Sequence, residues 1–289
     1  MNVFVTVVLM TIVIVASVFF LNRPQIMTVS ANIPDDFPPD EFSHSSFERL
    51  LRTYVDSNGH LDYQSWYEHT DAVGQLDSYL AAVTQYSPET TPERFVTSND
   101  ALAYWLYAYN AYVIKSILDR WPLESVTDVK APIEIVKGFG FFYRLRFIFG
   151  GRAYSLYTIE NKKIRAEYRD ARIHFVLNCG SESCPILRTE LPTDDALETL
   201  LQQAAVDFVS DERNVRIDQK SQRIVLSAIF KWYEKDFTND LRRRGLSADQ
   251  GLQAYIASIA PDPLRKAIAA CVGCKIEFDD YDWTVNRTR

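Results

Sequence analysis

The residues best suited to covalent chemistry are two cysteines that lie close together in the sequence. Cys179 and Cys184 flank the four residues GSES. A cysteine becomes a nucleophile when a base or a hydrogen-bond donor beside it favours the thiolate. Four intervening residues that include a glycine and two serines also allow the chain to turn, so that the two cysteines face each other as a disulfide requires. The segment predicts either a nucleophilic thiol at Cys179 or a structural disulfide, and both interpretations stay open.

Three polar residues are candidates to support such a thiol. His174 lies within the apolar run 172–179, where it is either a general base or a histidine satisfied inside the core. Glu160 is expected in the first turn of a helix, where the helix dipole stabilises a carboxylate without any catalytic role. Asn110 is surrounded by apolar and tyrosine residues. A buried amide without partners costs about 1 to 3 kcal/mol, so Asn110 is predicted to clamp a neighbouring backbone or to orient a histidine or an oxyanion.

The spacing of His174 and Cys179 argues against a direct pair. Along an extended strand, five positions separate the two residues by about 16 Å and place their side chains on opposite faces. A base for Cys179 is therefore expected from another element. The other histidines lie among polar residues and are predicted to be exposed: His44, His60 and His69.

A second pair of cysteines lies near the end of the chain. Cys271 and Cys274 form a C-x-x-C motif, which fits a redox pair or half of a zinc site. Together with Cys179 and Cys184 they would complete a set of four thiolate ligands. An oxidising compartment favours a disulfide instead.

The element expected to position Asn110 is a long helix over residues 99–121. Ser98, Asn99 and Asp100 are candidates for its N-terminal cap, and Trp121-Pro122 ends it because proline bars continuation. Since nearly every residue from 101 to 114 is apolar or tyrosine, this helix is predicted to be buried almost all round.

The rest of the chain predicts a mixture of strands and helices. Residues 139–152 and 154–156 are expected to form a hairpin around Gly150-Gly151, and residues 215–217 and 224–226 a second hairpin. Residues 172–179 are predicted to be a buried strand. Helices are expected at 47–55, 76–83, 196–209, 228–237 and 252–259. The predicted fold class is α+β: a single mixed domain with a central small sheet flanked by helices, preceded by an N-terminal transmembrane helix.

The N-terminal segment carries no charge between residues 3 and 21. This composition predicts a transmembrane anchor or uncleaved signal over residues 1–22 that contacts the membrane through residues 3–21. Residues 23–41 are acidic and proline-rich and are expected to form a linker, leaving residues 42–289 as the single domain. Arg23 favours a cytoplasmic location for the domain, but the paired cysteines favour export. A periplasmic or extracytoplasmic location at the cell membrane is predicted.

Composition excludes several classes of protein. The 289 residues are 47% hydrophobic, and 31 basic against 38 acidic residues give a formal net charge of -7. This is an ordinary globular composition, and its charge has the wrong sign for binding a phosphate backbone. No nucleic-acid partner and no cofactor are expected, and the sequence does not identify a protein or small-molecule partner.

Four segments, in order along the chain, resemble successive blocks of the domain of unknown function 547 family: residues 103–111, residues 154–161, residues 172–185, and residues 226–233 with Asp236 and Phe237. The resemblance covers roughly residues 101–237, and Cys271 and Cys274 fall outside it. It implies an exported or membrane-tethered protein, since bacterial members are commonly of that kind. The Cys, His and carboxylate content of the blocks is similar to that of papain-like or transglutaminase-like thiol enzymes, by analogy only.

Three functions are compatible with these residues. A membrane-tethered domain with a non-enzymatic binding or scaffold role is slightly favoured. The first alternative is a thiol-dependent hydrolase or acyl transferase with Cys179 as nucleophile, Glu160 or His174 as base and orienting group, and Asn110 as a supporting amide. The second is a domain stabilised by zinc, with four ligands: Cys179, Cys184, Cys271 and Cys274.

Overall fold

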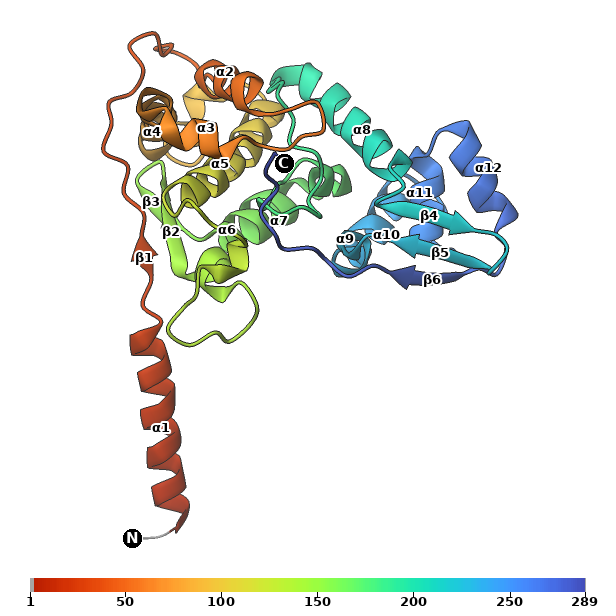
Figure 1. Ribbon diagram of the computed structural model, residues 1–289, viewed down its shortest axis with the longest axis horizontal. Coiled ribbons are helices and arrows are strands. Elements are labelled where there is room, and N and C mark those ends of the chain that lie inside the picture. Colours follow the sequence, from red (N-terminus) through yellow and green to blue (C-terminus); the bar gives the residue numbers. More distant parts are fainter. Residues whose placement is uncertain (1–2, 289) are drawn as a thin grey trace.

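The predicted long helix lies among the helices of the N-terminal half of the molecule (Figure 1). The computed structural model describes residues 3–288, and α5 runs over Ser98–Leu118 with most of its side chains buried. It ends three residues earlier than predicted. Its N-cap is Thr97, the residue before the predicted candidates, and Thr97 pairs reciprocally with one of them, Asp100. The Thr97 hydroxyl accepts from the Asp100 N–H, and the Asp100 side chain accepts from the Thr97 N–H. The long buried helix is confirmed.

Six further helices form with α5 what we call the helical part: α2 (Ser45–Tyr54), α3 (Tyr63–Glu68), α4 (Thr70–Gln85), α6 (Leu156–Thr158), α7 (Arg165–Tyr168) and α8 (Asp194–Ser210). Of these, α3, α4 and α8 contact α5, as does the π-helical turn Ile159–Ile164. A helix that is apolar all round must bury its whole circumference in this way. Strand β2 (Leu145–Phe149) packs on α5 as well, since the ring centroids of Phe147 and Phe149 lie 4.8 and 5.0 Å from that of Tyr112. The core of this helical part is strongly aromatic.

The strands form two separate three-stranded sheets, so the predicted central sheet is wrong although the α+β class is confirmed. In the first sheet β2 pairs with β1 in parallel and with β3 in antiparallel orientation: β1 (Gln25–Ile26), β2 (Leu145–Phe149) and β3 (Arg152–Tyr154). The second sheet has the order β4-β5-β6, with β6 parallel to β5: β4 (Val215–Asp218), β5 (Arg223–Leu226) and β6 (Lys275–Phe278). The second predicted hairpin is confirmed. The first is confirmed around Gly150-Gly151, but its first strand is shorter than predicted, because Gly140–Arg144 form a turn of π-helix. Neither sheet is central, because the neighbouring elements of the helical part pack on α5.

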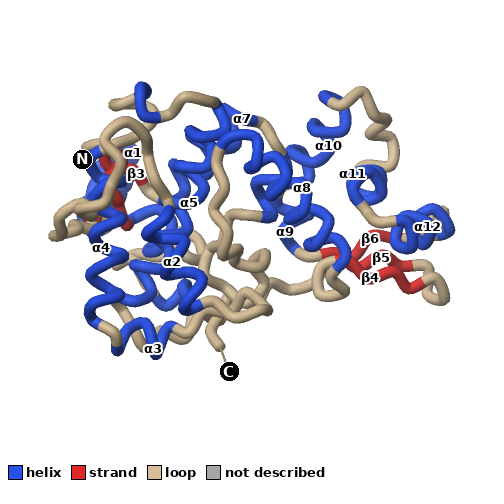
Figure 2. The backbone as a smooth tube through the Cα atoms, turned by 90° about the horizontal axis from the view of Figure 1, so that it is seen from above, coloured by secondary structure: helices blue, strands red, loops and turns tan. Residues whose placement is uncertain are grey.

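We call the segment from β4 to β6 the C-terminal part. Helix α8 connects it to the helical part (Figure 1). Four helices complete it: α9 (Ala228–Trp232), α10 (Glu234–Arg243), α11 (Leu252–Ile259) and α12 (Asp262–Ala270). Helices α11 and α12 lie beside the sheet, as the view from above shows (Figure 2). The end of this part then returns toward the centre of the molecule.

The predicted strand over residues 172–179 is also wrong. Ala171–Phe175 form a turn of 3-10 helix, and the following residues run irregularly to Cys179. The Asp170 side chain accepts a hydrogen bond from the Arg172 N–H at 2.8 Å and so caps this turn. The apolar side chains of the segment are buried against neighbouring helices instead of within a ladder. The separation of about 16 Å expected for His174 and Cys179 on a strand therefore does not apply.

The N-terminal segment forms α1 (Val3–Leu21), which extends away from the folded part (Figure 1). In the portion of the chain that the structure describes, no helix has the length and apolar character needed to cross a membrane. The prediction of a transmembrane helix in the N-terminal segment is therefore wrong. An uncharged apolar run predicts a helix, and a helix forms, but helical hydrogen bonding does not by itself establish a membrane span.

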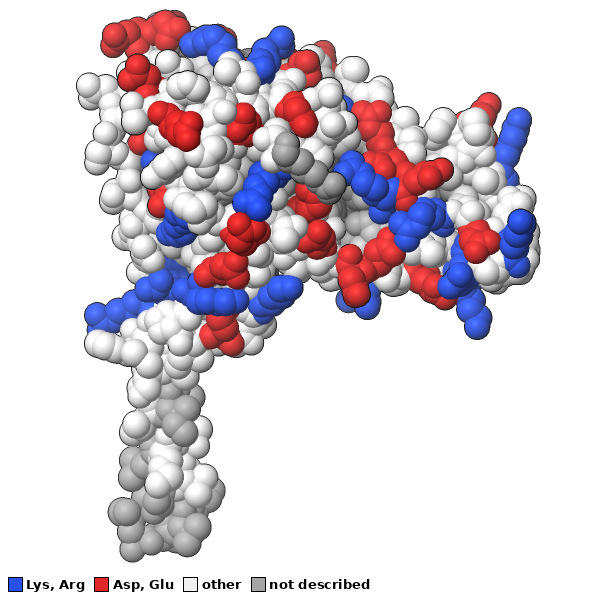
Figure 3. Space-filling model, viewed as in Figure 1, with Lys and Arg blue, Asp and Glu red and all other residues white. Residues whose placement is uncertain are grey.

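Charges are distributed unevenly along the molecule (Figure 3). On the face shown, acidic and basic side chains are interspersed over the folded part, and the sequence of α1 contains neither kind. Attraction between opposite charges at such a surface is individually weak, so the fold rests on its aromatic and aliphatic core.

The last residues cross back from the C-terminal part to the helical part. We call residues 279–288 the C-terminal strap. It makes isolated backbone bridges through Thr284 to Ser125, through Val285 to Ser181, and through Arg287 to Leu61. Figure 1 shows it leaving β6 and ending among the helices. Residues of the strap therefore contact the segment that follows Cys179, although they lie about a hundred positions later in the sequence.

Candidate functional site

A pocket of about 450 Å³ lies where the helical part, the C-terminal part and the strap meet. Three of the predicted site residues line it, namely Glu160, His174 and Cys179, together with Cys184. Asn110 does not line it. Whether these residues are catalytic stays a prediction, but the structure brings them to one place.

Cys179 is not in a disulfide, and its sulfur lies among hydrogen-bonding groups. Its Sγ is 3.3 Å from the Ser181 hydroxyl and 3.2 Å from the Tyr281 hydroxyl. Burial alone would raise the pKa of Cys179, but hydrogen bonds from Cys184, Ser181 and Tyr281 outweigh burial and lower the pKa to about 7. Near neutral pH a large share of this thiol is therefore thiolate.

The pKa of Cys184 is shifted in the direction opposite to that of Cys179. Its Sγ accepts from the Cys179 N–H at 2.9 Å and lies 3.1 Å from the Tyr281 hydroxyl. Burial, followed by the hydrogen bond and charge of Cys179, raises the pKa of Cys184 well above its usual range. Cys184 therefore keeps its proton while Cys179 loses one, and Tyr281 contacts both sulfur atoms.

His174 is buried and bonded to a carboxylate. Its Nε2 lies 2.8 Å from Asp236 Oδ2, which also accepts from Arg165 Nε at 2.7 Å, and its ring stacks on Tyr233 with centroids 3.8 Å apart. Burial lowers the pKa of His174 despite the hydrogen bond to Asp236. Among residues 3–288 no hydrogen bond joins His174 to Cys179. The hydrogen bond to Asp236 and the stacking on Tyr233 hold the imidazole ring in place, and the predicted catalytic role of His174 stays a prediction.

Glu160 also contacts Tyr233, through the hydroxyl group of that residue. It lies in a π-helical turn, Ile159–Ile164, and accepts a hydrogen bond of 2.5 Å from the Tyr233 hydroxyl. Burial, and next the charge of Glu160, raises the pKa of Tyr233 well above its usual range, so Tyr233 remains a donor. Tyr233 thus links Glu160 to the ring of His174.

Asn110 holds the backbone on the N-terminal side of Cys179. Its Nδ2 donates to the Val176 carbonyl at 3.0 Å, and its Oδ1 accepts from the Asn178 N–H at 2.9 Å. The Asn178 side chain continues the clamp by accepting from the Gly180 N–H at 2.8 Å. Of the two interpretations left open for Asn110, the geometry is that of the backbone clamp.

Gly180 allows the chain after Cys179 to lie directly on α5. Its φ is +80°, and an added Cβ would come within 2.5 Å of Ile117 and 3.1 Å of Val113. Gly180→Ala should therefore lower the free energy of unfolding by about 1 to 3 kcal/mol, through strain and overpacking. Urea unfolding tests this, with Gly151→Ala as the control, since Gly151 has φ +77° but open space at its Cβ. Equal losses in the two variants would show that close packing on α5 contributes nothing.

Four residues of the site were not predicted from the sequence: Tyr233, Asp236, Tyr281 and Trp283. Tyr233 and Asp236 belong to a block that was recognised, but no spacing rule connects them to His174, about 60 positions earlier in the chain. For Tyr281 and Trp283, the sequence signal is that two aromatic residues flank Asp282 in the strap. Trp232, Tyr281 and Trp283 pack together, with ring centroids 4.6 to 5.8 Å apart.

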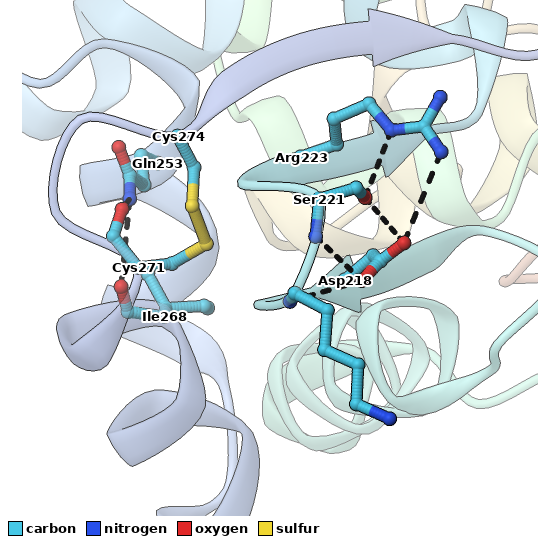
Figure 4. The surroundings of a disulfide bond; sticks show 8 residues. Asp218, Ser221, Arg223, Gln253, Ile268, Cys271 and Cys274 are labelled. Atoms are coloured by element: carbon cyan, nitrogen blue, oxygen red, sulfur yellow. Dashed lines mark hydrogen bonds and ion pairs between the residues drawn. A yellow bond between two sulfur atoms is a disulfide. The ribbon is translucent and has the colours of Figure 1, made fainter.

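The second cysteine pair lies elsewhere and is oxidised. Cys271 and Cys274 form a disulfide with a Cα separation of 5.4 Å, next to the β4–β5 hairpin (Figure 4). The Gln253 amide donates to the carbonyl of Cys271. The four cysteines are therefore not brought together. No group of three or more potential metal ligands occurs within the described part of the chain.

The comparison with protein families agrees with the resemblance seen in the sequence. Residues 94–209 match the family described as "Protein of unknown function, DUF547". This range contains Asn110, Glu160, His174, Cys179 and Cys184, while the block at 226–237 and the strap lie beyond it. Neither a curated protein nor a solved structure matches this chain.

Proposed function

We propose that this chain, whose residues 94–209 match the DUF547 family, is a thiol-dependent hydrolase or acyl transferase with Cys179 as its nucleophile. The observation that carries this proposal is the position of a disulfide-free thiol with a lowered pKa on the wall of a pocket. Strongly perturbed groups in a cleft are typical of active sites. The proposal reverses the slight preference for a non-enzymatic role.

The proposed chemistry needs no histidine base. The Cys179 thiolate adds to the carbonyl carbon of an ester, thioester or amide, the leaving group departs with a proton, and an acyl-cysteine remains for attack by water or another nucleophile. Tyr281 contacts Cys179, and burial keeps its pKa well above the usual range, so it holds a proton to donate. In this scheme His174 is a positioning residue that fixes Tyr233 against Glu160.

The test is the pH dependence of alkylation by iodoacetamide, followed residue by residue. Cys179 should react with a half-maximal rate near pH 7, well below the value of about 8.5 for an ordinary thiol. Tyr281→Phe removes one hydrogen bond to the thiolate and should move this midpoint up by about one to two pH units. Cys179→Ser identifies the labelled residue.

Two outcomes would contradict the proposal. One is a Cys179 that resists alkylation in the folded protein, and the other is a midpoint that matches an ordinary thiol and does not change in Tyr281→Phe. Trp232→Phe is the matched control. It alters an aromatic ring of the same pocket that packs on Tyr281 without removing a hydrogen bond to sulfur, and its midpoint should equal that of the wild type.

A binding role without catalysis is the second candidate. It is favoured by the aromatic wall of the pocket, where Trp232 is 47% exposed. Exposed aromatic side chains beside a cavity are typical of binding surfaces. A Cys179→Ala, His174→Ala protein that folds and keeps its cellular function would favour this role, whereas loss of function with retained folding would favour the enzyme.

A further inference from the structure

We propose a second activity for the same segment: Cys179 and Cys184 form a dithiol–disulfide pair that reduces a hydroperoxide, with Cys179 as the attacking thiol and Cys184 as the resolving thiol. This inference rests on the nucleophilic Cys179 of the proposed function. It additionally requires Cys184, for which acyl transfer has no need. The two activities can therefore be separated by experiment.

The backbone around the cysteines holds both sulfur atoms next to the Tyr281 hydroxyl. The Cys184 N–H donates to the Ser181 carbonyl at 3.0 Å, which closes a tight turn after Gly180. Cys184 Sγ lies 2.9 Å from the Cys179 backbone nitrogen, and both sulfurs lie within 3.2 Å of the Tyr281 hydroxyl oxygen. Two sulfur atoms that contact the same hydroxyl oxygen lie close to each other. A small rearrangement of the two cysteine side chains is therefore enough to form a disulfide.

The two thiols differ in the way that a two-step oxidation requires. An attacking cysteine is most effective as a thiolate, and a resolving cysteine attacks only after the first has been oxidised. Tyr281 can donate to the Cys179 thiolate while it accepts from the Cys184 thiol. Both cysteines are partly exposed along the pocket wall, so a small oxidant reaches them from solvent.

The reaction balances as follows. Cys179 sulfur attacks the terminal oxygen of the hydroperoxide, the O–O bond breaks, and the alkoxide leaves as an alcohol with a proton from Tyr281, which solvent replaces. Two electrons pass from sulfur to oxygen and leave a sulfenic acid. Cys184 sulfur then attacks Cys179 sulfur, the S–O bond breaks, and hydroxide leaves as water with the Cys184 proton. A dithiol reductant returns the pair to its starting state by exchange.

Oxidation has a consequence for the proposed function. In the disulfide the nucleophile is absent, so acyl transfer stops until a reductant restores Cys179. The Cys271–Cys274 disulfide lies outside the site and takes no part in this cycle.

The experiment uses the full chain with Cys179 and Cys184 reduced, treated with one equivalent of hydrogen peroxide and mapped by mass spectrometry of peptides. We expect a Cys179–Cys184 disulfide and complete loss of alkylation at both residues, reversed by dithiothreitol. In Cys184→Ser no disulfide forms, and Cys179 stops at the sulfenic acid, which dimedone captures. In Cys179→Ser no disulfide forms and Cys184 stays reduced, because the attacking thiol is absent.

The outcomes separate this inference from the proposed function. If Cys179 alkylates with a midpoint near pH 7 but peroxide yields no disulfide, the redox inference is wrong and the acyl-transfer proposal stands. A disulfide that forms with oxidised glutathione but not with peroxide also overturns the assignment of a hydroperoxide. If Cys179 reacts with neither reagent, both proposals fail. Cumene hydroperoxide as a second probe should give the same disulfide.

Discussion

Replacing Asn110 by leucine should lower the free energy of unfolding by about 2 to 5 kcal/mol, because two buried backbone groups lose their partner at once. Asn110 is 5% exposed, and its amide is bonded to the Val176 carbonyl and the Asn178 N–H. Leucine has a similar size but no polar atoms. The carbonyl and the N–H would therefore stay desolvated without compensation. Chemical denaturation with circular dichroism gives the measurement.

The same helix offers a matched control. Ser116 is fully buried on α5, and its hydroxyl has no hydrogen-bond partner among the described residues. Ser116→Ala should be neutral or slightly stabilising, since it removes a buried polar group that is already unpaired. Equal losses of stability in Asn110→Leu and Ser116→Ala would contradict the clamp. The clamp precedes Cys179 directly, so Asn110→Leu should also slow alkylation of Cys179 in the protein that remains folded.

Asn110 shows how far sequence reasoning reaches into the site. A single amide among apolar and tyrosine residues must find partners, and the clamp is one of the two outcomes that this requirement predicts. The identity of the partners depends on residues 176–178, whose conformation was mispredicted as a strand. Asp170 caps the 3-10 turn Ala171–Phe175 that precedes these residues, and a local hydrogen bond of this kind competes with the β propensity of a few apolar residues.

The contacts of Cys179 and His174 were beyond prediction for a different reason. Tyr281 reaches Cys179 only because the strap returns from the C-terminal part after β6 pairs with β5. Asp236 reaches His174 from the start of α10. Such pairings depend on the whole topology, and periodicity in a short window carries no information about them. The two hairpins, by contrast, were predictable because turn residues act locally.

His44 is a clear example of a residue that its sequence neighbours describe wrongly. It follows a serine at the end of an acidic segment and was predicted to be exposed, yet it is 5% exposed. Its ring packs edge-on against Tyr107, with centroids 4.9 Å apart, and its Nδ1 lies 2.8 Å from the Tyr79 hydroxyl. The chain before α2 folds over α4 and α5, and this packing buries a polar residue that hydropathy alone assigns to the surface.

This burial predicts a strong dependence of stability on pH. Burial lowers the pKa of His44 from 6.5 to about 3, only partly opposed by the charge of Asp100. The folded protein therefore holds His44 neutral, while the unfolded chain takes up a proton below about pH 6.5. Stability should be fully present above that pH and should fall progressively as the pH drops toward 3. One pKa unit corresponds to about 1.4 kcal/mol, so the complete loss is on the order of 4 to 5 kcal/mol.

His44→Gln should remove this part of the acid sensitivity. Glutamine does not titrate, and its amide oxygen can still accept from the Tyr79 hydroxyl. Between pH 7 and pH 4.5 the wild type should lose about 2 to 3 kcal/mol more than the variant, measured by urea unfolding at each pH. His174, whose pKa burial also lowers, adds to the acid sensitivity of both proteins and cancels in the comparison.

An exposed histidine provides the control for this difference. His69→Gln should lose stability with falling pH as the wild type does, because its side chain lies at the surface. If His44→Gln also followed the wild-type curve, His44 would not be buried in its neutral form. The packing of residues 42–44 on α4 and α5 would then be wrong. Burying a protonated imidazole without an ionic partner among Phe42, Tyr79 and Tyr107 is too costly.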